Sequence, residues 1–199
     1  MNPFRYGQVV TRSHYCRRPA LEKKLRAQIL AGQHTYVEGE RRTGKTSLIF
    51  EAVEKAKSRW IVYVDLLEVK SVEDVHKRIL NGMTKAGSRK NMLQGLLKAA
   101  AALRPTLTLD PITGLPSVSI DAAVQLKPES LEGLLDLLAG REFRNAVVAI
   151  DEFQDIRNLP DASQVLAVMR SKVQFLRTTP FVFCGSIRSD MHAIFTDPE

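Results

Sequence analysis

One segment of the chain constrains its fold more than any other: residues 39–46, which read Gly-Glu-Arg-Arg-Thr-Gly-Lys-Thr. They match the pattern G-x-x-x-x-G-K-T. We expect a short buried strand at 35–37, before the first glycine, and residues 45–57 follow with apolar side chains at helical spacing. A strand, a glycine-rich loop and a helix in this order predict an α/β fold, with a helix-covered and mainly parallel sheet.

The residue types of this loop suit the binding of phosphate. Gly39 and Gly44 allow close approach of the backbone and unusual dihedral angles, and the following helix points its N-terminal amides at an anion. Lys45 can reach the β- and γ-phosphates, and Thr46 offers a hydroxyl to Mg²⁺. The sequence thus predicts a site for ATP and Mg²⁺, with nucleotide contacts from Gly39, Glu40, Arg41, Arg42, Thr43, Gly44, Lys45, Thr46 and Ser47. We expect the Arg41 and Arg42 side chains to face solvent or a partner.

An acidic pair follows the most apolar run of the chain. Residues 146–150 read as a strand buried on both faces, and Asp151-Glu152 comes directly after them. At the carboxyl end of a parallel strand, Asp151 can hold Mg²⁺ together with Thr46, and Glu152 can activate an attacking water as the catalytic base. An acidic turn without function is the alternative. For Asp155 we favour a solvated surface position over a supporting role in the site.

A second buried strand, 181–184, ends in Gly185-Ser186-Ile187-Arg188. Ser186 is a catalytic candidate because a polar residue at this place can reach the γ-phosphate or the attacking water. Arg188 is a further catalytic candidate that would contact the γ-phosphate. The alternatives are a turn-forming serine and an exposed arginine.

The rest of the chain alternates between helices and strands. We expect a strand at 60–64 and a β-hairpin within 106–120, where the apolar period is two residues. Apolar spacing predicts helices that begin near Ala20, with Leu21, Leu25, Ile29 and Leu30 on one face, and helices at 71–83, 92–103, 128–139 and 161–178. The expected organisation is an N-terminal segment (1–34) and a core (35–199) with an insertion at about 81–130.

Composition excludes several classes of protein. The 199 residues suit one α/β domain, and Cys16 and Cys184 show neither disulfide nor metal-ligand spacing. The N-terminus lacks the apolar core of a signal peptide, and no run approaches the length needed to cross a bilayer. We therefore expect a cytoplasmic protein that has reduced thiols and does not enter a membrane.

The positive charge lies at the N-terminal end. Residues 1–60 hold 13 Lys and Arg against 5 Asp and Glu, whereas the remainder of the chain is close to neutral. This excess can serve nucleotide phosphates, nucleic acid or an acidic partner. A solvated basic helix face is the alternative, since no aromatic residues are interleaved with the charges.

These motifs resemble a known family. Gly39–Thr46, Asp151-Glu152 and Gly185-Ser186 are similar to the Walker A, Walker B and sensor 1 motifs of prokaryotic AAA-like ATPases. The nearest resemblance is to the archaeal-type ATPases, which are related to the STAND and origin-recognition ATPases. A segment before the loop also matches, with Tyr where the family usually has Phe: Tyr15, Arg18, Leu21, Glu22 and Leu25. The resemblance implies that residues 6–10, including Val9 and Val10, pack near the adenine.

The resemblance also implies a strand order of 5-1-4-3-2, with the sensor strand between the strand of the phosphate loop and that of Asp151. The sequence departs from the family pattern after the fourth strand: up to Glu199 we find no fifth strand, helical lid or winged helix.

These residues are compatible with more than one function. The first is ATP hydrolysis that drives a conformational switch or the remodelling of a protein partner, with self-association as family precedent. The alternative is a nucleotide-gated binding module, with DNA as a candidate partner and negligible hydrolysis in isolation. A small-molecule kinase or a GTPase is disfavoured, because no acceptor pocket or N-K-x-D motif is recognised.

Overall fold

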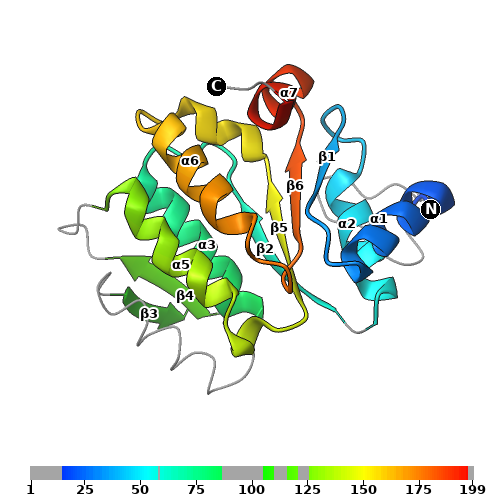
Figure 1. The fold of residues 1–199 in the computed structure, drawn as a ribbon, viewed down its shortest axis with the longest axis horizontal. Coiled ribbons are helices and arrows are strands. Elements are labelled where there is room, and N and C mark those ends of the chain that lie inside the picture. Colours follow the sequence, from blue (N-terminus) through cyan, green and yellow to red (C-terminus); the bar gives the residue numbers. More distant parts are fainter. Residues whose placement is uncertain (1–14, 58, 87–104, 110–115, 121–125, 197–199) are drawn as a thin grey trace.

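The computed structural model describes residues 15–57, 59–86, 105–109, 116–120 and 126–196. Their centre is a parallel four-stranded sheet of order β1-β6-β5-β2, which lies between two layers of helices in Figure 1. The strands are β1 (Thr35–Glu38), β2 (Trp60–Asp65), β5 (Ala146–Asp151) and β6 (Phe181–Gly185). The sensor strand β6 lies between the loop strand β1 and the Asp151 strand β5, which confirms this part of the expected order.

Burial follows the position of each strand in the sheet. The inner strands β5 and β6 are buried along their whole length, which explains their continuous apolar sequences. Strand β1 lies at an edge of the sheet and is only half-buried, with Tyr36 43% exposed, so our expectation of a buried strand there was wrong. Glu38 pairs with Gly185, and Asp65 pairs with Asp151. The carboxyl ends of all four parallel strands therefore lie at the same end of the sheet.

Helices cover both faces of the sheet and enclose two cores. On one face lie α1 (Pro19–Leu30) and α2 (Lys45–Lys55), which pack on Val147, Ala149 and Val182. The opposite face carries α3 (Val72–Ala86), α5 (Leu131–Leu138), α6 (Ala162–Val173) and α7 (Arg188–Thr196). Short 3₁₀ turns complete the described part: Pro128–Ser130, Arg141–Phe143 and Phe153–Asn158.

Apolar periodicity predicted most helix faces correctly. Every expected inward residue of α2, α3 and α5 is buried. Helix α1 differs, because Leu25 and Ile29 are buried but Leu21 and Leu30 are each 49% exposed. Helix α6 ends at Val173 rather than near 178, where the chain turns into the loop before β6. Helix α7 was not predicted, and the helix expected at 92–103 lies outside the described residues.

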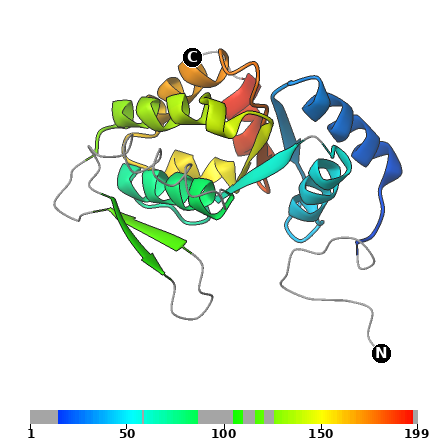
Figure 2. The same cartoon turned by 90° about the horizontal axis from the view of Figure 1, so that it is seen from below.

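The expected hairpin is present as β3 (Pro105–Leu109) and β4 (Pro116–Ile120). The two strands are antiparallel, with Thr106 opposite Ser119, and β4 lies alongside α3, as Figure 2 shows. In the described part of the chain, no helix is both long and apolar enough to cross a membrane.

Candidate nucleotide-binding site

The loop between β1 and α2 has two residues in the left-handed region, Arg42 (φ 63°) and Gly44 (φ 77°). A Cβ atom at position 44 would lie 2.7 Å from Nη2 of Arg18, so both backbone and space call for glycine there. At position 39 the backbone is not left-handed, and a Cβ would meet nothing closer than 3.5 Å. Of the two glycines in this loop, Gly44 thus uses the conformational freedom of glycine, and Arg42 also adopts a left-handed conformation.

Arg18 holds this loop from outside. Its Nη2 donates to the carbonyl oxygens of Thr43, at 2.7 Å, and Gly44, at 3.0 Å. The carboxylate of Glu22 accepts the backbone N–H of Arg18 at 2.8 Å and also binds Lys55 of α2. The hydrogen bond from Lys55 lowers the pKa of Glu22 below its usual value. This segment, whose sequence resembles the family, thus connects the loop to α1 and α2.

Lys45 lies inside the loop and is only 8% exposed. Its Nζ donates to the carbonyl oxygens of Gly39, at 2.7 Å, and Glu40, at 2.9 Å. Among the residues that the structure describes, no side chain caps the N-terminus of α2, which begins at Lys45 after Gly44. Uncapped helix amides and an ammonium group in one loop are a donor set for phosphate oxygens.

The other loop residues divide by burial. Glu40, Arg41, Arg42 and Thr43 are exposed, as we expected for the two arginines, whereas Ser47 is buried. The hydroxyl of Thr43 donates to the carbonyl of Glu40 at 2.8 Å, which closes the loop on itself. Val9 and Val10, the expected neighbours of the base, lie outside the described residues.

Asp151 is the meeting point of several donors. The hydroxyl of Thr46 lies 2.5 Å from its Oδ2, and the hydroxyl of Tyr63 donates to the same oxygen at 2.9 Å. The backbone N–H of Glu152 donates to Oδ1 at 3.0 Å. The thiol of Cys184 also hydrogen-bonds to this carboxylate. Burial and the charge of Asp151 raise the pKa of the thiol. We did not predict a role for Tyr63. The register of β2 against β5 is the feature that would have indicated its contact with Asp151.

Glu152 follows in a left-handed conformation (φ 49°, ψ 42°), which is rare for a residue with a side chain and typical of functional sites. Its Oε2 accepts hydrogen bonds from Ser186 Oγ and from Gln154 Nε2, each at 2.6 Å. Gln154 in turn accepts the backbone N–H of Ser186 at 3.3 Å. The structure therefore brings Glu152 and Ser186 together, and adds Gln154, which sequence reasoning missed.

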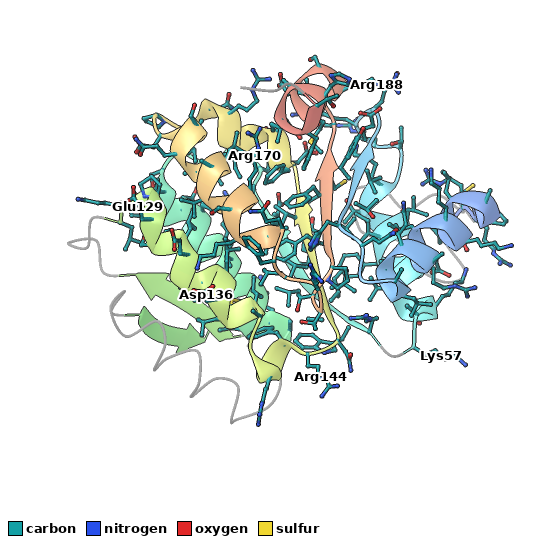
Figure 3. All side chains as sticks on the ribbon, viewed as in Figure 1. Lys57, Glu129, Asp136, Arg144, Arg170 and Arg188 are labelled. Carbon is teal, nitrogen blue, oxygen red and sulfur yellow. The ribbon has the colours of Figure 1, made fainter. Side chains whose placement is uncertain are left out.

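Asp155 occupies another place than we expected, and Arg188 lies beside the loop. Asp155 is buried rather than solvated, and its carboxylate accepts the backbone N–H of Glu68 at 2.7 Å and an amide N–H of Gln154 at 3.0 Å. Arg188 begins α7 at the outer end of β6, as Figure 3 shows. Its side chain is 78% exposed and forms an ion pair with Glu38 at 3.3 Å, next to the loop but apart from Glu152 and Ser186.

A cavity of about 540 Å³ adjoins the loop. Its walls come from α1, β1 and the loop, and include Arg18, Tyr36, Thr43 and Lys45. It lies directly beside the side chain of Lys45, which belongs to this donor set.

No protein-family model matches the sequence, and the search of curated proteins gives no match. Solved structures do resemble it. The Walker-type ATPase PABY2304 of Pyrococcus abyssi has a TM-score of 0.60 at 19% identity, over 97% of this chain and 51% of that one. Orc1 of Aeropyrum pernix, solved in complex with DNA, has a TM-score of 0.51 at 14% identity, over 93% of this chain and 44% of that one.

A third similar structure is Cdc6p of Pyrobaculum aerophilum, with a TM-score of 0.49 at 16% identity, over 98% of this chain and 45% of that one. The chain thus spans about half the length of these proteins or less. At these identities the likeness establishes the fold, an α/β fold shared with Walker-type ATPases.

Proposed function

We propose that this chain binds ATP with Mg²⁺ at residues 39–46 and hydrolyses it to drive a conformational switch or the remodelling of a protein partner, as a member of the AAA-like ATPases. One observation carries the proposal: the hydroxyl of Thr46 lies 2.5 Å from the carboxylate of Asp151, although 105 residues separate them. A chance match to the loop pattern gives no reason for such a pairing. The fold likeness to a Walker-type ATPase supports the same conclusion.

The residues present fit a magnesium ion. Mg²⁺ prefers hard oxygen ligands and is usually held by one or two of them, together with substrate phosphates. Thr46 Oγ1 and the Asp151 carboxylate are such oxygens, already side by side in the structure. When bound, the ion would neutralise charge on the phosphates.

Lys45 and the start of α2 would bind the phosphates. Lys45 Nζ now donates to the carbonyl oxygens of Gly39 and Glu40, which hold the ammonium group inside the loop. Phosphate oxygens carry more negative charge than carbonyl oxygens and are the stronger acceptors for this cation. The lysine therefore exchanges acceptors on binding without leaving the loop.

Glu152 is the proposed base for the attacking water. Both of its described hydrogen bonds, from Ser186 and Gln154, go to Oε2. Within the described part of the chain Oε1 accepts none, so this oxygen is placed to take a proton from water. Ser186 and Gln154 orient the carboxylate, and Ser186 connects it to the end of β6.

The second candidate is a nucleotide-gated binding module with negligible hydrolysis, and DNA is a candidate ligand for it. The solvent face of α1 supports it, because Lys23, Lys24 and Arg26 are all exposed there. Of the similar structures, the Aeropyrum pernix Orc1 was solved with DNA. A steep loss of DNA affinity with added salt is expected for this candidate, since phosphate contacts release counterions.

The test compares phosphate release and ATP binding for the wild type and Glu152→Gln. We expect turnover to fall by at least about 100-fold, the usual contribution of a general base, while ATP affinity stays within about twofold. Glu129→Gln, at an exposed site, is the matched control and should match the wild type. Equal turnover in wild type and Glu152→Gln would reject the role of Glu152. A wild type that binds ATP without turnover would instead favour the binding module.

A further inference from the structure

The register of the sheet brings Tyr63 to the carboxylate of Asp151. Asp65 pairs with Asp151 and Tyr63 with Ala149 on the neighbouring strand. Because side chains alternate along a strand, residues 63, 149 and 151 all point to the face that carries α2. Residue 149 has only a methyl group, which leaves space for the tyrosine ring. The Tyr63 hydroxyl donates to Asp151 Oδ2 at 2.9 Å.

The surroundings fix this ring and keep its hydroxyl a donor. The ring centroid lies 5.4 Å from that of Phe50 on α2, and the backbone carbonyl of Tyr63 packs against Gly82 of α3. A phenol hydroxyl has one proton to donate, and here it is directed at the carboxylate of Asp151.

The donors around Asp151 have different roles once a metal ion is present. Thr46 and Tyr63 both donate to Oδ2, while the backbone N–H of Glu152 holds Oδ1. Thr46 is itself a proposed metal ligand, so its hydroxyl oxygen would bind the ion as well as contact Asp151. Tyr63 has no such second role, and its bond to Oδ2 can persist. Side chains that hydrogen-bond to the ligands of a metal ion commonly tune the affinity for that ion.

We propose that Tyr63 is a positioning residue for Asp151. Its hydroxyl holds the Asp151 carboxylate in the orientation that the magnesium ion requires. This inference rests on the proposed function, because it assumes that Thr46 and Asp151 bind the ion. It adds a side chain from β2 to a site otherwise built from the loop, β5 and β6. It also predicts that the loss of one hydroxyl changes metal affinity but not the affinity for the nucleotide itself.

The experiment compares the wild type with Tyr63→Phe, which removes the hydroxyl and keeps the ring. Mn²⁺ replaces Mg²⁺ as a paramagnetic probe, and its binding in the presence of ATP is measured from the loss of the free-ion resonance signal. ATP affinity in the presence of EDTA is measured by calorimetry. Thr179→Val is the matched control, since it also removes a buried hydroxyl, one that donates to the carbonyl of Leu138 at 3.1 Å before the start of β6, at the opposite end of the strand from Ser186.

For Tyr63→Phe we expect the half-saturating Mn²⁺ concentration to rise by at least about tenfold. Its ATP affinity without metal, and both affinities of Thr179→Val, should stay within about twofold of the wild type. Extra Mg²⁺ should restore part of the turnover of Tyr63→Phe. Thermal unfolding shows whether both variants are folded.

Three outcomes would overturn the inference. If Tyr63→Phe binds Mn²⁺ as the wild type does, the hydroxyl does not position Asp151, although the proposed function stands. If ATP affinity in EDTA falls as much as Mn²⁺ affinity, Tyr63 has only a structural role. A folded wild type that binds no ATP in either condition would reject the proposed function, and the inference with it.

Discussion

Arg18 lies across the end of the phosphate-binding loop, with its Nη2 atom 3.0 Å from the carbonyl oxygen of Gly44. The same nitrogen donates to Thr43 at 2.7 Å, so one guanidinium holds two consecutive carbonyl groups. Both carbonyls point away from the loop interior to meet it, which favours the inward direction of the neighbouring amides. A side chain from outside the loop thus shapes the proposed phosphate site.

This contact predicts a loss of nucleotide affinity in Arg18→Ala. Hydrogen bonds that involve a charged group contribute about 1.5–3 kcal/mol each when buried, and less at this partly exposed position. We expect ATP affinity to fall by about three- to tenfold in calorimetric titration. Arg26→Ala removes an exposed arginine of the same helix and is the control. Equal affinity in Arg18→Ala and the control would show that the loop is organised without Arg18.

The ion pair between Glu22 and Lys55 predicts a pH-dependent contribution to stability. The pKa of Glu22 is lowered in the folded state, from the usual value of 4.5, mainly by the hydrogen bond from Lys55. Its contribution is therefore present above that value and is lost as the pH falls through the folded-state pKa. Glu22→Gln should lower the free energy of unfolding at neutral pH by on the order of 1 kcal/mol.

In urea unfolding series, this difference should shrink as the pH falls below 4.5, because the wild-type carboxyl then becomes neutral as well. Glu129→Gln, at an exposed position, should show no such trend. A difference that stays constant down to acid pH would contradict the ion pair as its source.

Two glycines in helices give opposite predictions for the same substitution. A Cβ at Gly82 would lie 2.6 Å from the backbone carbonyl of Tyr63, so Gly82→Ala must push α3 from β2. We expect a loss of stability of about 1–3 kcal/mol, typical of overpacking. At Gly133 in α5 a Cβ would meet nothing within 4 Å, and Gly133→Ala should stabilise by roughly 0.5–1 kcal/mol. Thermal unfolding of both variants tests the pair, and destabilisation by Gly133→Ala would be the unexpected result.

Much of this fold could be predicted because its signals are local. The buried runs at 146–150 and 181–184 and the apolar spacing of α2, α3 and α5 each identify an element from neighbouring residues alone. The pairing of Thr46 with Asp151 was predictable too, because Asp151 ends β5 and the loop after β1 leads directly to Thr46, and a parallel sheet brings the ends of both strands together.

What the sequence did not reveal depends on tertiary contacts. Tyr63 is an ordinary residue for a strand, and only its register with Ala149 directs it to Asp151. Asp155 has the sequence of a surface turn but is buried because it accepts the backbone N–H of Glu68. Leu21 and Leu30 fit the apolar face of α1, yet the helix packs on the sheet along a narrower stripe.

The central claim is that this chain binds Mg-ATP through Lys45, and calorimetric titration with Mg-ATP, beside Mg-GTP and a Lys45→Ala variant, tests it most directly. We predict that the wild type binds ATP more tightly than GTP and that Lys45→Ala weakens ATP binding by at least tenfold, or about 1.4 kcal/mol. Undiminished ATP binding by Lys45→Ala, or no binding by the folded wild type, would contradict the account.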